Sequence, residues 1–304
     1  MRGPVTVIGG ANTDILGFIE RRLVPKDSNP GHVRTSAGGV GRNIAENLAR
    51  LGITTRLVTA LGEGPEADVL AAGCAELGID VRAVPVKGLA GSRYLAIMDA
   101  SGDLALAVSD MRALDAVTPA ALDVHAAALD DAAVIVLDAN LPAETLAHVA
   151  GRWSGTSLFL DTVSVAKAPR ASGLLGALHT LKTNELEAAA LTGTAPGAVD
   201  TAVTALLAAG APRVIVTGGI AGALIATASE RVRFVPPPAT VLSATGAGDA
   251  YMAGLVYAEL AGFDLTHTAA FSSAMAAVAL ASELTVSDTI AEESVLEMME
   301  AMLS

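Results

Sequence analysis

Several residue types that mark common protein classes are scarce in this sequence. Its single cysteine, Cys74, excludes an internal disulfide and a thiolate metal cluster, and the apolar residues at helical spacing around it indicate a buried structural thiol. Long hydrophobic runs are also missing: the most apolar late segment, 274–281, is far shorter than the roughly 18 residues that a spanning helix requires. The chain begins with an expected strand at 5–8 that runs straight into Gly9 and Gly10, which is unlike a targeting segment. We therefore expect a cytoplasmic protein with no membrane partner.

Positive charge is scarce as well. The 304 residues include 19 Lys and Arg against 32 Asp and Glu, which gives a formal net charge of −13, and the basic residues form no cluster. A phosphate backbone would meet overall repulsion, so a nucleic-acid partner is not expected. A small anion such as ATP remains compatible with this charge, because helix N-termini and one divalent ion can reverse the field locally.

Short apolar runs alternate with longer segments at helical spacing along most of the chain. Hydrophobic residues make up 52% of the sequence, which is enough to form a large core. The strand candidates are 5–8, 55–59, 134–137, 157–160 and 214–217, and the helix candidates are 42–51, 67–77, 142–152, 185–191 and 201–209. This alternation predicts an α/β fold with a mainly parallel central sheet flanked by helices on both faces. In such folds ligands bind beyond the carboxyl ends of the strands.

Two segments, 16–35 and 83–110, interrupt the alternation. The first is polar, whereas the second contains the runs 94–98 and 104–108 on either side of a turn, a pattern typical of a β-hairpin. A few strands outside the main sheet are enough for a lid but too few for a second core. We expect a single α/β domain over 1–304 with a small β-strand lid built from these two segments.

A glycine-rich segment, Thr245-Gly246-Ala247-Gly248-Asp249, stands just before an apolar helical pattern. Small residues at this place let the backbone N–H groups of Ala247, Gly248 and Asp249 converge on a transferring phosphoryl group, and the helix dipole adds to their effect. The carboxylate of Asp249 can then accept the proton of an attacking hydroxyl. Taken alone, the segment is also compatible with a glycine-rich turn in which Asp249 is only a favourable first-turn residue.

A second glycine-rich segment, Gly38-Gly39-Val40-Gly41-Arg42-Asn43, also leads into a helical pattern. Its glycines permit close approach of a ligand to the backbone, and Asn43 can donate and accept hydrogen bonds toward sugar hydroxyls. Further upstream, Asp14 follows a buried strand, where a carboxylate can bridge two vicinal hydroxyls. Each residue also has a structural alternative, Asn43 as an ordinary helix-start residue and Asp14 as a turn former.

Taken together, the two glycine-rich segments resemble the paired signatures of the ribokinase-like (PfkB) carbohydrate kinases, and the similarity covers nearly the whole chain. Between them, Asn184-Glu185-Leu186-Glu187 resembles the Asn-x-x-Glu motif at the family's magnesium and triphosphate site, and 217–222 resembles its nucleotide-binding turn. The resemblance implies a ribokinase-like fold that uses ATP and Mg²⁺. It further implies a catalytic base, Asp249, an anion hole formed by the backbone of Gly246, Ala247, Gly248 and Asp249, a metal-binding residue, Glu187, and nucleotide-binding residues, Asn184, Thr217, Gly219, Gly222 and Thr245.

Longer strings resemble the pseudouridine kinases within this family, a subfamily that phosphorylates the 5′-hydroxyl of the C-nucleoside pseudouridine. These strings are 7–14, 39–52, 94–97, 109–111 and 164–168. The resemblance implies that the acceptor nucleoside contacts Asn12, Asp14, Gly39, Gly41, Arg42, Asn43, Ser92, Tyr94 and Lys167. Ser92 and Tyr94 would lie near the base, whereas Lys167 has three open alternatives: contact with the base, contact with phosphate, or a solvated surface position.

The sequence departs from the wider family at one cation-binding position. Ribokinases commonly carry an Asp two residues before the Thr of their Thr-Gly-Ala-Gly-Asp motif, where it helps to bind potassium. Ser243 occupies that position here, and a neutral hydroxyl is a weaker cation ligand, so activation by a monovalent cation is not predicted.

Two alternatives to a pseudouridine kinase follow from the same resemblance. One is a kinase of another acceptor, such as ribose, fructose or adenosine. The other is a catalytically silent sugar-binding regulator, against which the presence of Asp249 argues, because binding alone does not need a base. The sequence also predicts a homodimer through the lid, since an exposed strand edge requires pairing or cover.

Overall fold

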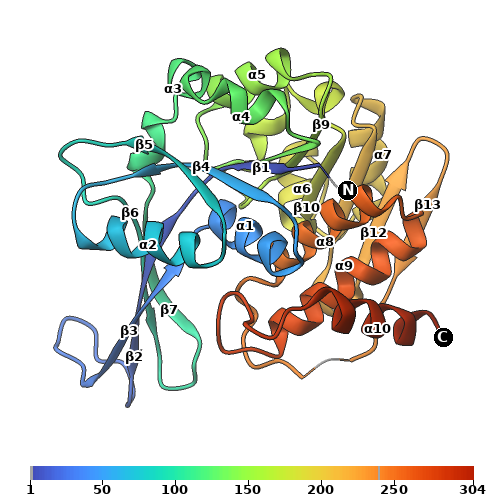
Figure 1. Cartoon of the computed structure of the whole chain (residues 1–304). Helices are drawn as coiled ribbons and strands as arrows, with labels where there is room; N and C mark the ends of the chain where they lie inside the picture. Colours follow the sequence, from blue (N-terminus) through green and yellow to red (C-terminus); the bar gives the residue numbers. More distant parts are fainter. Residues whose placement is uncertain (1–2, 239) are drawn as a thin grey trace.

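The computed structural model describes residues 3–238 and 240–304, and a nine-stranded sheet runs through its centre (Figure 1). The strand order is β13-β12-β11-β10-β9-β8-β1-β4-β5. All neighbouring strands from β11 to β5 in this list pair in parallel. Strand β12 pairs antiparallel with β11 and β13, which confirms the expected mainly parallel sheet. The strands are β1 (Val5–Ile8), β4 (Thr55–Leu61), β5 (Asp80–Pro85), β8 (Val134–Asp138), β9 (Ser157–Asp161), β10 (Thr180–Asn184), β11 (Arg213–Thr217), β12 (Ala223–Thr227) and β13 (Arg231–Phe234).

Helices cover both faces of this sheet, because its strands carry apolar side chains on both sides. In β8, Val134 and Val136 face one helical layer and Ile135 and Leu137 face the other. The first layer contains α1 (Val40–Arg50), α2 (Pro65–Glu76), α8 (Ala247–Ala261), α9 (Leu265–Leu280) and α10 (Glu292–Leu303). The second contains α3 (Pro119–Val124), α4 (Ala126–Asp130), α5 (Ala143–Arg152), α6 (Glu185–Thr192) and α7 (Val199–Ala208).

Four short 3₁₀ helices lie between the strands and α-helices of the described residues. The 3₁₀ turns are Arg112–Ala116, Ala168–Ala171, Leu175–Ala177 and Gly219–Ala221. Across residues 3–238 and 240–304, no helix has both the length and the apolar character that crossing a bilayer would require.

A second, four-stranded sheet of order β3-β2-β6-β7 forms the lid. Its strands are β2 (Asn12–Ile19), β3 (Gly31–Gly38), β6 (Ser92–Met98) and β7 (Leu104–Asp110). The antiparallel pairing of β6 with β7 confirms the hairpin expected at 94–108. The polar segment 16–35 is also a hairpin, and it extends further at both ends than the sequence indicated, because β2 pairs along β6 from Asn12 onward.

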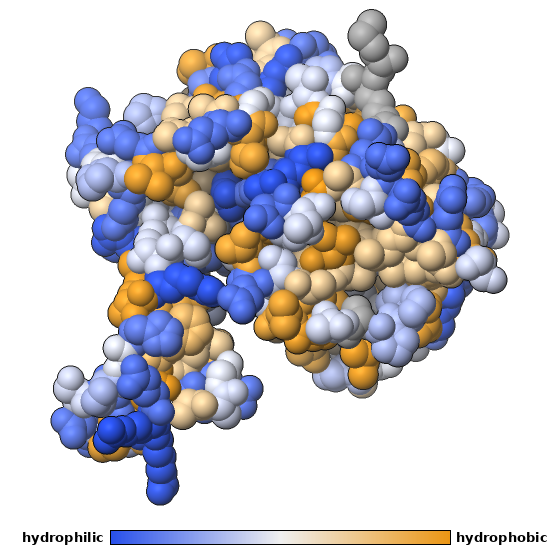
Figure 2. Space-filling view, turned by 60° about the horizontal axis from the view of Figure 1, so that its bottom comes forward, coloured by the Kyte–Doolittle hydropathy of each residue, from blue (hydrophilic) through white to orange (hydrophobic). Residues whose placement is uncertain are grey.

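The lid projects from the body beside the carboxyl ends of the central strands. Only Gly9, Gly10 and Ala11 separate β1, an interior strand of the main sheet, from β2, an interior strand of the lid. Figure 1 shows the four lid strands extending away from the body, and Figure 2 shows them as a narrow arm with a recess where arm and body meet.

Candidate active site

The start of helix α8 provides a group of backbone donors. Gly246 adopts a left-handed conformation with φ of 84°, and a Cβ atom there would lie 1.8 Å from the carbonyl oxygen of Thr285, so only glycine fits. The turn that it makes starts the helix at Ala247. The first N–H groups of a helix have no intrahelical acceptor, so those of Ala247, Gly248 and Asp249 are free to bind an anion in front of the helix.

Asp249 lies in this first turn as a half-buried carboxyl group. Its Oδ2 accepts a hydrogen bond of 2.8 Å from Nδ2 of Asn43, a residue 206 positions earlier in the chain. Burial, followed by repulsion from Asp161, raises the pKa of Asp249 to about 7, although the hydrogen bond from Asn43 opposes this rise. A carboxyl group with a pKa near neutrality is suited to take a proton from an alcohol at physiological pH.

Helix α1 holds Asn43 at this place. The Nη1 atom of Arg42 donates to Oδ1 of Asn43 (3.1 Å) and to the carbonyl oxygen of Ala37 (3.3 Å), and its Nη2 atom forms an ion pair with Glu46. Arg42 therefore fixes which end of the Asn43 amide faces Asp249. At the start of the helix, Gly39 has φ of 100°, and a Cβ atom there would lie 2.4 Å from the carbonyl oxygen of Gly10, which requires glycine.

A buried carboxylate, Asp138, ties the two glycine-rich loops together. Its Oδ2 accepts from the N–H groups of Gly10 (2.7 Å) and Gly41 (3.0 Å), while its Oδ1 accepts from the N–H of Asn140 (2.9 Å). Asp138 is fully buried, and burial raises its pKa above the ordinary value. The loop after β1 and the start of α1 are thus held to the end of β8 by one side chain.

Four of the residues predicted to contact the acceptor, Asn12, Asp14, Ser92 and Tyr94, share one face of the lid sheet with Gly38, and we call it the inner lid face. The register places Asn12 opposite Ser92 and Asp14 opposite Tyr94. Nδ2 of Asn12 donates to Oδ1 of Asp14 at 2.5 Å, and burial raises the pKa of Asp14. The buried hydroxyl of Ser92 has no hydrogen-bond partner among the described residues, as expected for a group that awaits a polar ligand.

The predicted nucleotide-binding residues gather at the ends of β10 and β11. The register pairs Asn184 with Thr217, and Gly219 and Gly222 follow in the next turn. Asn184 and Glu187 form a capping box: Oδ1 of Asn184 accepts from the N–H of Glu187 (2.9 Å), and Glu187 accepts from both nitrogens of Asn184. Thr245, the remaining predicted nucleotide-binding residue, stands two positions before the first residue of α8, and its N–H donates to the hydroxyl of Ser243 (3.2 Å).

Lys167 contacts the loop that follows β8. Its Nζ donates to Oδ1 of Asn140, and the amide nitrogen of Asn140 lies 3.5 Å from the place of a Cβ on Gly10. Burial lowers the pKa of Lys167. The loop that carries Asn140 is held in turn by Arg170, whose Nη1 donates to three successive carbonyl oxygens, at 139, 140 and 141.

Three charged residues that sequence reasoning did not single out form a row across the strand ends: Asp138, Asp161 and Lys182. The register pairs Asp138 with Asp161 and Asp161 with Lys182, and all three side chains face the layer of α1 and α8. Sequence signals did exist, since both aspartates end buried strands and Lys182 interrupts an otherwise uncharged strand.

Residues 4–291 of the chain match the family described as pfkB family carbohydrate kinase. The chain belongs to this family. One relative is a pseudouridine kinase from Escherichia coli K12. The two sequences are 34% identical over 301 residues, which cover 97% of this chain and 96% of that protein. A second relative, described as the uncharacterized sugar kinase YeiI of the same organism, is 34% identical over 297 residues, 96% of this chain and 82% of that protein.

Solved structures agree with the family assignment. A carbohydrate kinase from Agrobacterium tumefaciens aligns with a TM-score of 0.86 and 31% identity, covering 98% of this chain and 97% of that one. A ribokinase from Thermotoga maritima aligns with a TM-score of 0.87 and 24% identity, covering 98% and 99%, and shows the same fold. The pfkB protein described here is therefore an ATP-dependent kinase of a sugar or nucleoside with a ribokinase-like fold.

ATP-dependent kinases of this kind usually require Mg²⁺, and the residues at the end of β10 fit such an ion. Among the described residues, no three His, Cys, Asp or Glu side chains gather into a metal cluster. Mg²⁺ bound with a triphosphate needs only one or two carboxylates, because phosphate oxygens and water complete its coordination. Oε1 of Glu187 accepts a single hydrogen bond, from Nδ2 of Asn184, and so keeps capacity for a metal or its water.

Proposed function

We propose that this protein transfers the γ-phosphoryl group of ATP to the 5′-hydroxyl of pseudouridine. The observation that carries this proposal is the position of Asp249, a carboxyl group with a pKa near 7 in the first turn of α8. The inner lid face, with Asn12, Asp14 and Ser92, supplies polar groups for a ribose. The 34% identity to a pseudouridine kinase over 97% of the chain supports the choice of acceptor.

In the proposed reaction Asp249 takes the proton of the acceptor's 5′-hydroxyl. The 5′-oxygen forms a bond to the γ-phosphorus while the bond from that phosphorus to the β,γ-bridging oxygen breaks, and ADP leaves with the electron pair. The N–H groups of Ala247, Gly248 and Asp249 stabilise the charge on the transferring group. Mg²⁺, held through Glu187 and Asn184, would supply neutralisation of the triphosphate when it is bound.

The nucleotide is proposed to lie against Thr217, Gly219 and Gly222, and the acceptor against the inner lid face, Gly39, Gly41 and Asn43. Lys167 belongs to the acceptor side in this arrangement, because its partner Asn140 lies beside Gly10. We therefore propose contact of Lys167 with the base. Ser243 leaves the cation position without a carboxylate, so turnover is proposed to be independent of added potassium.

Side-by-side kinetics with pseudouridine, uridine, adenosine, ribose and fructose test the acceptor. Pseudouridine differs from uridine by a ring N–H beside the sugar, and an acceptor in the pocket for that donor would be left unpaired with uridine, at a cost of about 1–3 kcal/mol. We expect a kcat/KM at least about tenfold higher for pseudouridine than for uridine, which corresponds to roughly 1.4 kcal/mol. If ribose, fructose or adenosine were the best acceptor, the pseudouridine assignment would be wrong while the kinase assignment stood.

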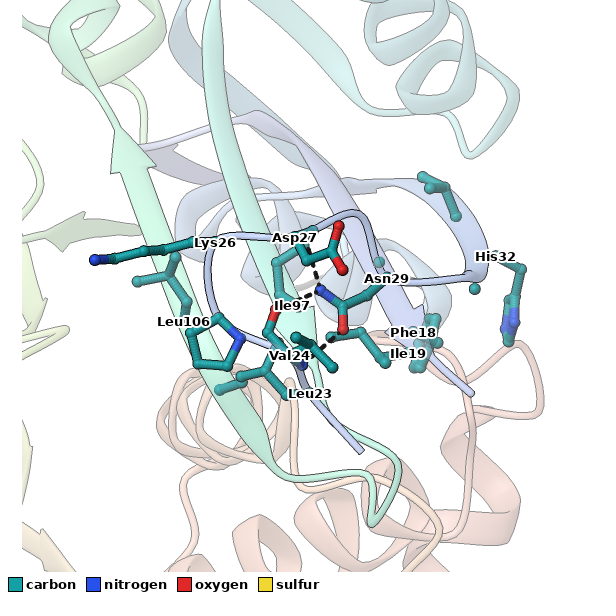
Figure 3. Close-up of a pocket in the computed structure, with 15 residues that line it drawn as sticks. Phe18, Ile19, Leu23, Val24, Lys26, Asp27, Asn29, His32, Ile97 and Leu106 are labelled. Atoms are coloured by element: carbon teal, nitrogen blue, oxygen red, sulfur yellow. Dashed lines mark hydrogen bonds between the residues drawn. The ribbon is translucent and has the colours of Figure 1, made fainter. Parts of the chain in front are cut away.

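We also propose a homodimer through the face of the lid opposite the inner lid face. Alternate residues of the four strands give this outer lid face an apolar patch, which consists of Ile15, Gly17, Ile19, Val33, Leu95, Ile97, Leu106 and Val108. Val33, Leu106 and Val108 are 69%, 64% and 55% exposed. A pocket of about 600 Å³ opens on this face beneath the loop after β2, where Asn29 holds Val24 through two hydrogen bonds (Figure 3). Such a surface suits the same face of a second copy.

A further inference from the structure

Lys182 is a buried cation for which the proposed reaction has so far no use. It lies near the carboxyl end of β10 with its side chain 8% exposed, and its Nζ donates to Oδ2 of Asp161 at 2.7 Å. Asp161 itself is 4% exposed. An ammonium group has three N–H donors, and among the described residues Asp161 is the one acceptor at hydrogen-bond distance from Nζ. Two buried donors are therefore left for another partner.

These donors border the space in front of α8. Nζ of Lys182 lies 3.0 Å from where a Cβ on Gly248 would stand, so a side chain at that position would press against the ammonium. Gly248 is in the first turn of α8, between the two other residues whose free N–H groups face an incoming anion. The ammonium of Lys182 and the backbone donors of α8 are thus neighbours, although they come from different elements.

The surroundings of Lys182 keep it charged. Its Nζ is paired with the buried carboxylate of Asp161, which neighbours Asp138 in the row across the strand ends, and Asp249 follows Gly248 in the first turn of α8. Three carboxylates at this end of the sheet would repel a triphosphate. A fixed cation with free donors among them removes part of that repulsion at the place where charge moves during phosphoryl transfer.

We propose that Lys182 is a catalytic residue of this kinase, whose ammonium donates to a non-bridging oxygen of the transferring phosphoryl group alongside the N–H groups of α8. Asp161 holds the ammonium in position through its ion pair. The proposal rests on the proposed kinase reaction and adds to it a side-chain member of the anion hole. The competing explanation is that Lys182 serves only as the counter-ion of Asp161.

A pair of variants separates these two explanations. Lys182→Met alone would leave Asp161 charged, buried and unpaired, which endangers folding. The comparison is therefore between Asp161→Asn, whose amide oxygen can still accept from Nζ and whose ammonium keeps Asp249 as a nearby carboxylate, and the double variant Asp161→Asn with Lys182→Met, which lacks the ammonium. The affinity of each for ADP, and for ADP with aluminium fluoride, Mg²⁺ and pseudouridine, is measured by calorimetry together with turnover. Aluminium fluoride mimics a phosphoryl group in transfer, so it reports on the anion hole.

We expect ADP affinity to agree within about threefold between the two variants, while turnover and the affinity for the aluminium fluoride complex are lower by about 10²–10³-fold in the double variant, as for loss of one anion-hole donor. Equal turnover and equal affinity for the fluoride complex would overturn the assignment and leave Lys182 as a counter-ion. Failure of the wild-type protein to bind ATP or to form ADP would instead overturn the proposed function itself, and the inference with it.

Discussion

At the scale of single residues, Asp249 combines a raised pKa with a position among backbone donors. Replacing it with Asn keeps the shape and the hydrogen bond from Asn43 but removes the base. We expect turnover of Asp249→Asn to fall by about 10²-fold or more, with nucleotide affinity little changed. Turnover within a few-fold of the wild type would show that the base lies elsewhere.

The wild-type kcat/KM should also fall as the pH drops below about 7, because Asp249 is then protonated.

The same carboxyl group should make stability depend on pH. Its pKa is about 7 in the folded protein against an ordinary value of 3.8, so the folded state binds more protons than the unfolded state between these values. Stability therefore falls as the pH rises from about 4 to 7. We expect Asp249→Asn to be more stable than the wild type at pH 8, by up to about 4 kcal/mol, and no more stable at pH 4. Thermal unfolding of both proteins across this range tests the prediction, and a pH-independent difference would contradict it.

At the scale of elements, Asp138 holds the loop after β1 and the start of α1 to the end of β8. In Asp138→Asn an amide nitrogen must face at least one backbone N–H, which removes a buried hydrogen bond worth about 1–3 kcal/mol. We expect KM for the acceptor to rise by about tenfold or more, while the affinity for ADP stays unchanged. Asp14→Ala, which removes a proposed direct contact, provides the comparison and should weaken acceptor binding about ten- to hundred-fold. A parallel loss of ADP affinity would show general loosening instead.

The sequence predicts a strand or helix where a few neighbouring residues already show its characteristic pattern. The apolar runs of β1, β8 and β9 are visible because both faces of these strands are buried. Strand β10 was not predicted, because Lys182 and its neighbouring threonines interrupt the run, and β2 was masked by Asn12 and Asp14, which read as turn residues.

The candidate site divides in the same way. The glycine-rich segments around Gly39 and Gly248 are complete within a few residues, so the sequence predicts them directly. The bond from Gly10 to Asp138 joins positions 128 apart, and the pairing of Asp161 with Lys182 depends on the register of two strands. Contacts of this kind follow from the fold and cannot be read from any local pattern.

At the scale of the whole molecule, the exposed apolar outer lid face predicts association. Leu106→Glu places a charge on this face, on the edge strand β7 and in the lining of its pocket. We expect the wild-type protein to sediment as a dimer at micromolar concentration and Leu106→Glu to sediment as a monomer, since a buried unpaired charge opposes the interface. Ser229→Glu, at an exposed turn on the body, serves as the matched control and should remain dimeric. A monomeric wild-type protein would contradict the proposed dimer.

The two faces of the lid have a consequence for how such a protein can change over time. Polar residues that we propose to contact the acceptor and apolar residues of the outer lid face alternate along the lid strands, so substitutions can alter either property separately. Insertion or deletion of one residue near the start of β6 cannot alter one property alone. It would shift the register of the strand by one residue, so that Leu95 would move to the inner lid face and Tyr94 to the outer lid face. Acceptor choice and self-association are therefore free to diverge by point mutation, but they are jointly protected against changes in strand length.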